Sequence, residues 1–267
     1  MRVVSLACSN TEIVCALGCA NMLVGVDDHS DYPEEVVAAL PRVGPDLDID
    51  VERVAALRPD LVLASLTVPG HERIIERLER AGLPYLAPEP TSLAHVLRDV
   101  GEIARALGQQ QRGRALAARL SGAFAPAPVV DARPSILVEW WPKPVIVPGR
   151  DSWVSELIEL AGGRNPFAGR PVKSTPITDE EAALAQPDAV VMSWCGVRTE
   201  KYRRHVVERR AAWRDFPALR HGRVVPIPEA WLGRPGPRLV QGLAALRGVV
   251  ASCAVAHSKE RASASSI

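Results

Sequence analysis

Short runs of β-branched residues alternate with segments of helical period along this chain, and this alternation constrains the fold more than any other feature. The expected strands at residues 2–6, 23–26 and 61–64 are separated by expected helices at 11–17 and 51–57. Strands joined by helices in this order form βαβ units, whose strands lie in a parallel sheet. The sequence therefore predicts an α/β fold.

The alternation continues almost to the end of the chain, with one interruption. Apolar residues recur at helical spacing from 92 to 124, so we expect one long amphipathic helix there, which Gly108 could kink. A Pro-rich stretch at 126–134 follows it. The remaining expected elements are helices at 71–81, 153–160, 200–210 and 237–250, and strands at 84–87, 135–139, 189–193 and 224–227.

These elements divide the chain into three parts. We expect residues 1–91 to form an N-terminal α/β lobe, residues 92–126 a bridging helix, and residues 127–267 a C-terminal α/β lobe with a closing helix. The tail at 257–267 is rich in Ser and Ala, a composition typical of disorder.

A weak internal repeat relates the two lobes. The stretch that begins at Asp50 matches the stretch that begins at Thr178 without a gap, and each runs through a Pro-Asp pair into an apolar strand. Asp50 and Thr178 are suitable N-cap residues, and Glu52 and Glu180 then fall in the first helical turn, where the helix dipole favours negative charge. The glutamates either stabilise the helix starts alone or form an acidic pair that contacts a two-fold partner.

Composition excludes several classes of function. The 32 Lys and Arg residues balance the 31 Asp and Glu residues, so no overall charge favours nucleic acid or an anionic membrane. No apolar run is long enough to span a membrane, and the chain starts on a strand rather than on an export signal. The five cysteines have irregular spacing, which argues against a disulfide framework but leaves one bridge open.

Several short motifs follow one another in a family-specific order: Val4-Ser5-Leu6, Ser9-Asn10-Thr11-Glu12-Ile13, Val24-Gly25-Val26, Asp31-Tyr32-Pro33, residues 52–60, Gly149-Arg150-Asp151-Ser152-Trp153, residues 160–165, residues 220–224 and residues 234–240. Together they resemble the cobalamin and iron-siderophore substrate-binding proteins of ABC importers. The resemblance implies two Rossmann-like α/β lobes bridged by one long α-helix, the class III periplasmic-binding-protein arrangement, with ligand held between the lobes.

The same resemblance implies a function. It predicts a monomeric binding protein, not an enzyme and without a cofactor of its own, that captures a corrinoid such as cobalamin and delivers it to the membrane subunits of an ABC importer. Such proteins work in the periplasm or elsewhere outside the cytoplasm. Because the chain shows no signal peptide, a cytoplasmic location also stays open.

Tryptophans follow several expected strands of the second lobe. Trp140 and Trp141 follow one strand, Trp194 follows the next, and Trp231 follows the last. Open α/β sheets bind ligands at the carboxyl ends of their strands, and an indole offers an apolar face with an N–H donor. These residues suit a flat corrin ring, although they could instead belong to a core or a lobe interface. Trp153 and Trp213, inside expected helices, are assigned to the core.

The resemblance adds specific residues to the site. It places His29 and Trp140 at ring contacts and Arg234 at a polar contact, and it makes Glu52 and Glu180 the glutamates that dock onto arginines of the transporter. The chain departs from the family pattern at Asp46, Ser65, Ser174 and Ala230, the last with Glu229 beside it.

His29 also suits a metal. It lies in a polar loop after a strand, and a neutral imidazole is a good axial ligand for cobalt or iron at the centre of a macrocycle. The alternative is a surface histidine hydrogen-bonded to the Asp residues around it.

Two other functions remain open at this point. The same fold could bind haem or a ferric siderophore, although an anionic siderophore requires several cations and Arg234 is the one candidate. A different class is a glycosyltransferase-like or metallocofactor-scaffold enzyme with similar lobes.

Overall fold

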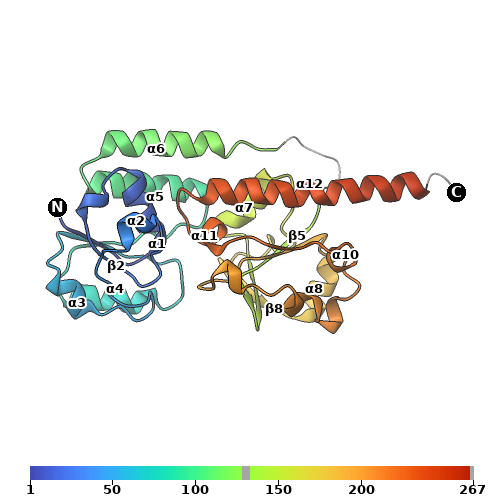
Figure 1. Cartoon of the computed structure of the whole chain (residues 1–267), viewed down its shortest axis with the longest axis horizontal. Helices are drawn as coiled ribbons and strands as arrows, with labels where there is room; N and C mark the ends of the chain where they lie inside the picture. The colour runs from blue at the N-terminus through green and yellow to red at the C-terminus, as the bar shows by residue number, and fades with distance from the viewer. Residues whose placement is uncertain (128–132, 265–267) are drawn as a thin grey trace. The chain divides into compact units, whose positions relative to one another are not determined.

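The computed structural model of the chain describes residues 1–127 and 133–264 (Figure 1). It divides into two compact units, one formed by residues 1–122 with 235–237 and the other by the rest of the chain. Each unit contains a parallel sheet covered by helices, which confirms the predicted α/β class.

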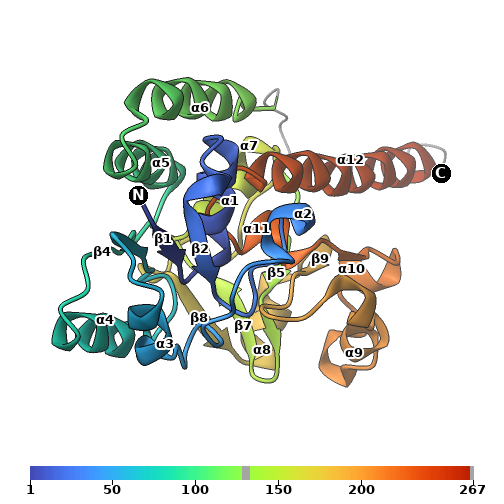
Figure 2. The same cartoon turned by 60° about the vertical axis from the view of Figure 1, so that its left-hand side comes forward.

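The first unit is built on a four-stranded parallel sheet of order β2-β1-β3-β4. Figure 2 shows β1 and β2 side by side. The chain leaves β1 toward β2 and then crosses to β3 on the other side, so the topological switch point lies between β1 and β3. The elements are β1 (Val3–Ser5), α1 (Cys8–Ala16), η1 (Ala20–Met22), β2 (Leu23–Val26), α2 (Glu34–Val37), α3 (Val51–Ala56), β3 (Leu61–Leu63), α4 (His71–Arg80), β4 (Tyr85–Leu86), α5 (Leu93–Ala106) and α6 (Gln110–Ala123).

The central strands of this sheet are buried along their whole length. Val4 and Val62, from β1 and β3, pack with Val54 of α3 and with Ile74 and Leu78 of α4 in one hydrophobic cluster. Strands covered by helices on both faces have continuous rather than alternating apolar runs, which is why the sequence marked them clearly.

The single helix predicted for residues 92–124 is wrong, because the structure has two helices there. Gly108 adopts φ +69°, Gln109 N–H donates to the Ala104 carbonyl at 2.7 Å and Gly108 N–H donates to the Arg105 carbonyl at 3.0 Å. These bonds form a Schellman motif that ends α5. The chain then returns, and a Cβ on Gly113 would lie 2.3 Å from the Ala104 Cβ, so the two helices pack side by side (Figure 1). The bridging role expected for residues 92–126 remains a prediction.

The second unit contains a three-stranded parallel sheet of order β10-β9-β5 and a small antiparallel sheet of order β6-β7-β8. Its elements are β5 (Ile136–Glu139), β6 (Trp141–Pro142), β7 (Val145–Pro148), α7 (Trp153–Leu160), β8 (Ser174–Ile177), α8 (Asp179–Ala185), β9 (Ala189–Met192), η2 (Thr199–Lys201), α9 (His205–Glu208), η3 (Ala211–Trp213), α10 (Pro217–Arg220), β10 (Val224–Pro226), α11 (Glu229–Leu232) and α12 (Leu239–Ala264). The antiparallel sheet was not predicted from the sequence, because the strands β6, β7 and β8 are short and contain proline. Proline in a short apolar run is typical of an edge strand or a loop.

Two further helix predictions need correction. The helix expected at 200–210 is broken into η2 and α9, because Tyr202 has an extended backbone and places its ring in the core. The closing helix α12 runs to Ala264, so the disordered tail predicted from residue 257 is wrong up to that point, and residues 265–267 lie outside the described residues. Helix formers such as Ala, Glu and Lys explain the extension. No helix in the described part is both long and apolar enough to cross a membrane.

Candidate functional site at the strand ends

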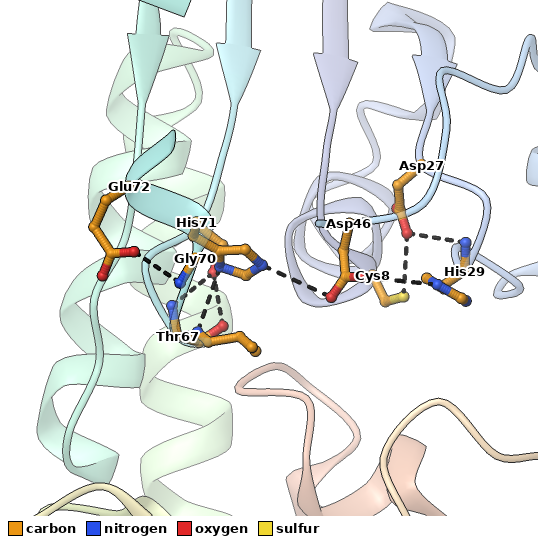
Figure 3. A network of polar contacts seen from close by, with 10 residues as sticks. Cys8, Asp27, His29, Asp46, Thr67, Gly70, His71 and Glu72 are labelled. Atoms are coloured by element: carbon orange, nitrogen blue, oxygen red, sulfur yellow. Dashed lines mark hydrogen bonds and ion pairs between the residues drawn. The ribbon is translucent and has the colours of Figure 1, made fainter. Parts of the chain in front are cut away.

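The carboxyl ends of the first sheet carry a network of polar side chains (Figure 3). The loop after β2 begins with Asp27, and the loop with Asp46 lies beside it, because Val43 continues alongside Val26. Asp28 N–H donates to the Gly44 carbonyl at 2.9 Å, and Gly44 N–H donates to the Asp28 carboxylate at 3.3 Å, so the two loops are held together. Binding sites of open α/β sheets form at this edge.

Asp27 fixes the loop that carries His29. Its buried carboxylate accepts the Ser30 hydroxyl at 2.5 Å, the His29 backbone N–H at 3.0 Å and a longer contact of 3.8 Å from the Cys8 thiol. Burial raises the pKa of this carboxyl above its usual range. The imidazole of His29 is therefore presented on an anchored loop, with 46% of its side chain exposed.

Asp46 lies between two histidines. Its Oδ1 is 3.8 Å from His29 Nε2, and its Oδ2 is 3.7 Å from Nε2 of His71, the first residue of α4. His71 Nδ1 accepts the Val68 backbone N–H at 3.4 Å, so the neutral ring carries its proton on Nε2 and directs it toward Asp46. The contact with His71 lowers the pKa of Asp46 below its usual value. In the sequence Asp46 is a departure from the family pattern, but no spacing signal links it to His71.

Glu139 organises the strand ends of the second unit. It is the last residue of β5 and is fully buried. Trp194, after β9, donates its indole N–H to Glu139 Oε1 at 2.8 Å, and Arg210 forms an ion pair with the other oxygen. Sequence reasoning missed this carboxylate, although a charged residue at the end of an apolar strand was the available signal.

The four candidate tryptophans differ in exposure. Trp194 is 6% exposed, belongs to the core cluster of the unit and packs on Tyr202 at a ring distance of 5.2 Å, which favours the core interpretation. Trp140 is 7% exposed and its carbonyl accepts Cys195 N–H at 3.0 Å. Trp141, in β6, is 41% exposed, and Trp231, in α11, is partly buried. Trp153 and Trp213 are buried, as predicted.

Arg234 lies just after α11 and is paired with an acid. Its Nε is 3.2 Å from Glu229 Oε2, and both side chains are mostly buried, at 12% and 16% exposure. The absence of a side chain at Gly233 makes room for this contact, since a Cβ there would lie 2.6 Å from Glu229 Oε1. The pair is close to neutral, so Arg234 does not present an isolated positive charge.

Glu52 and Glu180 are both exposed at the second position of their helices, α3 and α8. The predicted caps are confirmed. Asp50 accepts the Arg53 backbone N–H at 3.0 Å, and the Thr178 hydroxyl accepts the Glu181 N–H at 3.2 Å within a capping box.

Comparison with known proteins decides the family. The sequence profile of the periplasmic binding proteins matches residues 3–230. The chain belongs to the periplasmic binding protein family. This binding protein is 30% identical over 251 residues to the uncharacterized ABC transporter substrate-binding lipoprotein YvrC of Bacillus subtilis, covering 91% of the chain and 77% of the relative. It is 27% identical to the vitamin B12-binding protein of Vibrio parahaemolyticus, over 91% of the chain and 86% of that protein.

Solved structures agree with the fold. The periplasmic heme-binding protein RhuT from Roseiflexus sp. RS-1 superposes with a TM-score of 0.81 at 28% identity, over 95% of this binding protein and 98% of RhuT. The vitamin B12-binding protein BtuF of Vibrio cholerae gives a TM-score of 0.73 at 23% identity, over 94% and 97% of the two chains, and this likeness shows the fold alone. The predicted class III fold is therefore confirmed.

Proposed function

We propose that this binding protein captures a corrinoid, cobalamin or a close analogue, and delivers it to an ABC importer. The role as a substrate-binding protein of an ABC transporter rests on the family and on relatives named as substrate-binding proteins of ABC transporters or as vitamin B12-binding proteins. A relative named as a lipoprotein and the periplasmic binding protein family support a location outside the cytoplasm.

The pairing of Arg234 with Glu229 is the observation that carries the choice of ligand class. Anionic siderophores require cations at the binding site. The one arginine that the family pattern places there already has a carboxylate 3.2 Å away. A ligand without net negative charge on its side groups, such as an amide-substituted corrinoid, fits this arrangement better.

The proposed contacts come from strand ends of both units. Trp141 and Trp231 supply the more exposed indoles of the second unit, whereas Trp140 and Trp194 expose little surface and contribute less contact area. His29 of the first unit supplies an imidazole for the cobalt of the corrinoid. Its loop is fixed by Asp27, which favours a defined ring position.

Haem is the second candidate, because solved structures of heme-binding proteins are among those most similar in both fold and sequence. RhuT and a periplasmic heme-binding protein from Pseudomonas aeruginosa are each 28% identical to this chain. The same imidazole of His29 suits haem iron, so the metal contact does not separate the two ligands.

One titration tests the proposal. Purified protein is mixed separately with aquocobalamin, dicyanocobinamide and haem, and binding is followed by the visible spectrum and by calorimetric heat. We expect the corrinoids to bind more tightly than haem. Tighter binding of haem would move the function to the second candidate, and no binding of any of the three would overturn the proposal.

A further inference from the structure

Asp46, at the strand ends of the first unit, lies next to a buried histidine nitrogen whose role the fold does not explain. Nε2 of His71 is buried, lacks a hydrogen-bond partner within the described residues, and points at Asp46 from 3.7 Å (Figure 3). A buried donor without a partner costs free energy, so its retention calls for a reason.

Asp46 is not neutralised by a permanent cation. In the described part of the first unit its ion-pair partners are the two histidines, His29 and His71, and neither is a Lys or Arg. Asp48 in the same loop, by contrast, lies 4.0 Å from Arg77. The side chain of Asp46 is 38% exposed, so part of the carboxylate is open to solvent, with His29 near Oδ1 and His71 near Oδ2.

We infer that Asp46, with His71 behind it, forms a subsite that accepts hydrogen bonds from the amide groups on the rim of the macrocycle and disfavours carboxylates. The inference rests on the proposed function and adds to it the feature of the ligand that is selected. An ionised carboxylate accepts N–H donors strongly and repels a second carboxylate at the same distance.

The neighbouring charges act in the same direction. Asp28, in the loop after β2, is exposed and carries the same sign, and Asp48, beyond Asp46, is also exposed but lies 4.0 Å from Arg77. The Arg42 guanidinium donates to the carbonyls of Asp27 and Ser30 at 2.9 and 2.6 Å. Arg42 therefore stabilises the loop backbone instead of offering its guanidinium to a carboxylate.

Matched probes isolate this effect from the choice of macrocycle. Iron protoporphyrin IX and its bis-amide share one ring, and they differ only in whether the two side groups end in carboxylates or amides. Dicyanocobinamide and its hydrolysed polycarboxylate form a second pair. Binding constants are measured for the wild type, for Asp46→Asn, and for Asp48→Asn, which removes the same charge from the same loop. Asp46→Ser is a second variant in case the amide of Asn substitutes for the carboxylate.

The wild type should prefer each amide probe over its carboxylate partner by about tenfold or more, and Asp46→Asn or Asp46→Ser should reduce that preference about tenfold. Asp48→Asn should change it by less than about twofold, because screening weakens a more distant exposed charge. Equal effects of the Asp46 and Asp48 variants would overturn the subsite while leaving the proposed function intact. If the wild type bound none of the four probes, both the subsite and the proposed function would be overturned.

Discussion

Arg58 and Gln186 occupy the same position of the internal repeat, and both have a left-handed backbone, with φ of 47° and 41°. They are the two non-glycine residues with positive φ among residues 1–127 and 133–264. Arg58 follows the end of α3, and Gln186 follows the last residue of α8. The two copies of the repeat therefore share a local backbone conformation as well as a sequence pattern.

The aspartates two residues further on complete the likeness. Asp60 Oδ2 accepts the backbone N–H of Arg2 at 2.6 Å, just before β1, and Asp188 Oδ2 accepts that of Ser135 at 2.8 Å, just before β5. Each Asp backbone N–H in turn donates to the carbonyl of the same partner at 2.8 Å. The Pro-Asp pair thus ties the end of one helix to the start of a neighbouring strand in both units.

Glycine at position 58 should stabilise the protein. Arg58→Gly removes the steric cost of a left-handed non-glycine residue, and we expect a gain of about 0.5–1 kcal/mol in the free energy of unfolding. Urea unfolding measures it. Gln186→Gly should gain less, because the Gln186 side chain donates to the Ala183 carbonyl at 2.8 Å. Ala56→Gly, at a helical position, is the control and should destabilise; a loss for Arg58→Gly would contradict the strain argument.

The capping box of α8 should make stability depend on acid pH. The backbone N–H of Thr178 and the guanidinium of Arg170 hold the pKa of Glu181 below its ordinary value of 4.5. A depressed pKa stabilises the fold above the ordinary value, and this contribution is lost as pH falls through the lowered pKa. Glu181→Gln should therefore be less stable than the wild type near neutral pH, and the difference should shrink below pH 4.5.

Thermal unfolding midpoints across that pH range provide the measurement. Glu76→Gln, at an exposed glutamate of α4 paired with Arg80, controls for the loss of one surface charge. A difference between wild type and Glu181→Gln that stays constant with pH would contradict the assignment.

The strands and the helix starts could be predicted from the sequence because their signals are local. Apolar runs at residues 61–63 and 189–192, and the caps at Asp50 and Thr178, need no knowledge of distant contacts. The separation of α5 from α6 was not predicted, because helical periodicity persists through a turn that Gly108 alone marks.

The site was harder to predict because its features depend on residues distant in sequence. Glu139 meets Arg210 and Trp194 only in the folded unit, and His71 meets Asp46 across two loops. The position of Trp194 after a strand suggested a ligand contact, but its ring lies in the core cluster of the unit and donates its indole N–H to Glu139. Exposure of an aromatic residue is set by such partners and not by its position after a strand.

Charge reversal at the two exposed helix starts should abolish delivery but not capture. Glu52→Arg and Glu180→Arg place repulsive charges at the proposed contacts with transporter arginines, while neither residue belongs to the proposed ligand contacts. We expect each variant to lose most of the ligand-dependent stimulation of the importer ATPase and to bind ligand within about twofold of the wild type. Glu76→Arg should stimulate normally. Full stimulation by the double variant would refute the docking role.

Leu184 should add an apolar contact beside Glu180. It lies four residues further along α8, on the same helix face, and is 88% exposed. The equivalent position of the repeat is Ala56, so the apolar contact would be specific to the second unit. Leu184→Ser should weaken importer stimulation about tenfold without lowering thermal stability, and Ala56→Ser should have little effect. An unchanged Leu184→Ser response would show that the leucine stays outside the interface.

The buried ion pair of Glu139 and Arg210 should be a large contributor to the stability of the second unit. Glu139 is fully buried, and Arg210 also stacks over the ring of Trp213 at 4.3 Å. Arg210→Ala leaves a buried carboxylate without its cation, for which we expect a loss of about 3–5 kcal/mol in unfolding free energy. Tryptophan fluorescence during urea unfolding would measure it.

A double variant separates the charge from the packing around it. Glu139→Gln combined with Arg210→Met removes both charges and keeps an oxygen that can accept the Trp194 indole N–H. It should recover most of the stability lost in Arg210→Ala, because the cost arises from an unpaired buried charge and not from a missing attraction. Equal losses in the single and double variants would mean that contact of Arg210 with Trp213 matters more than its charge.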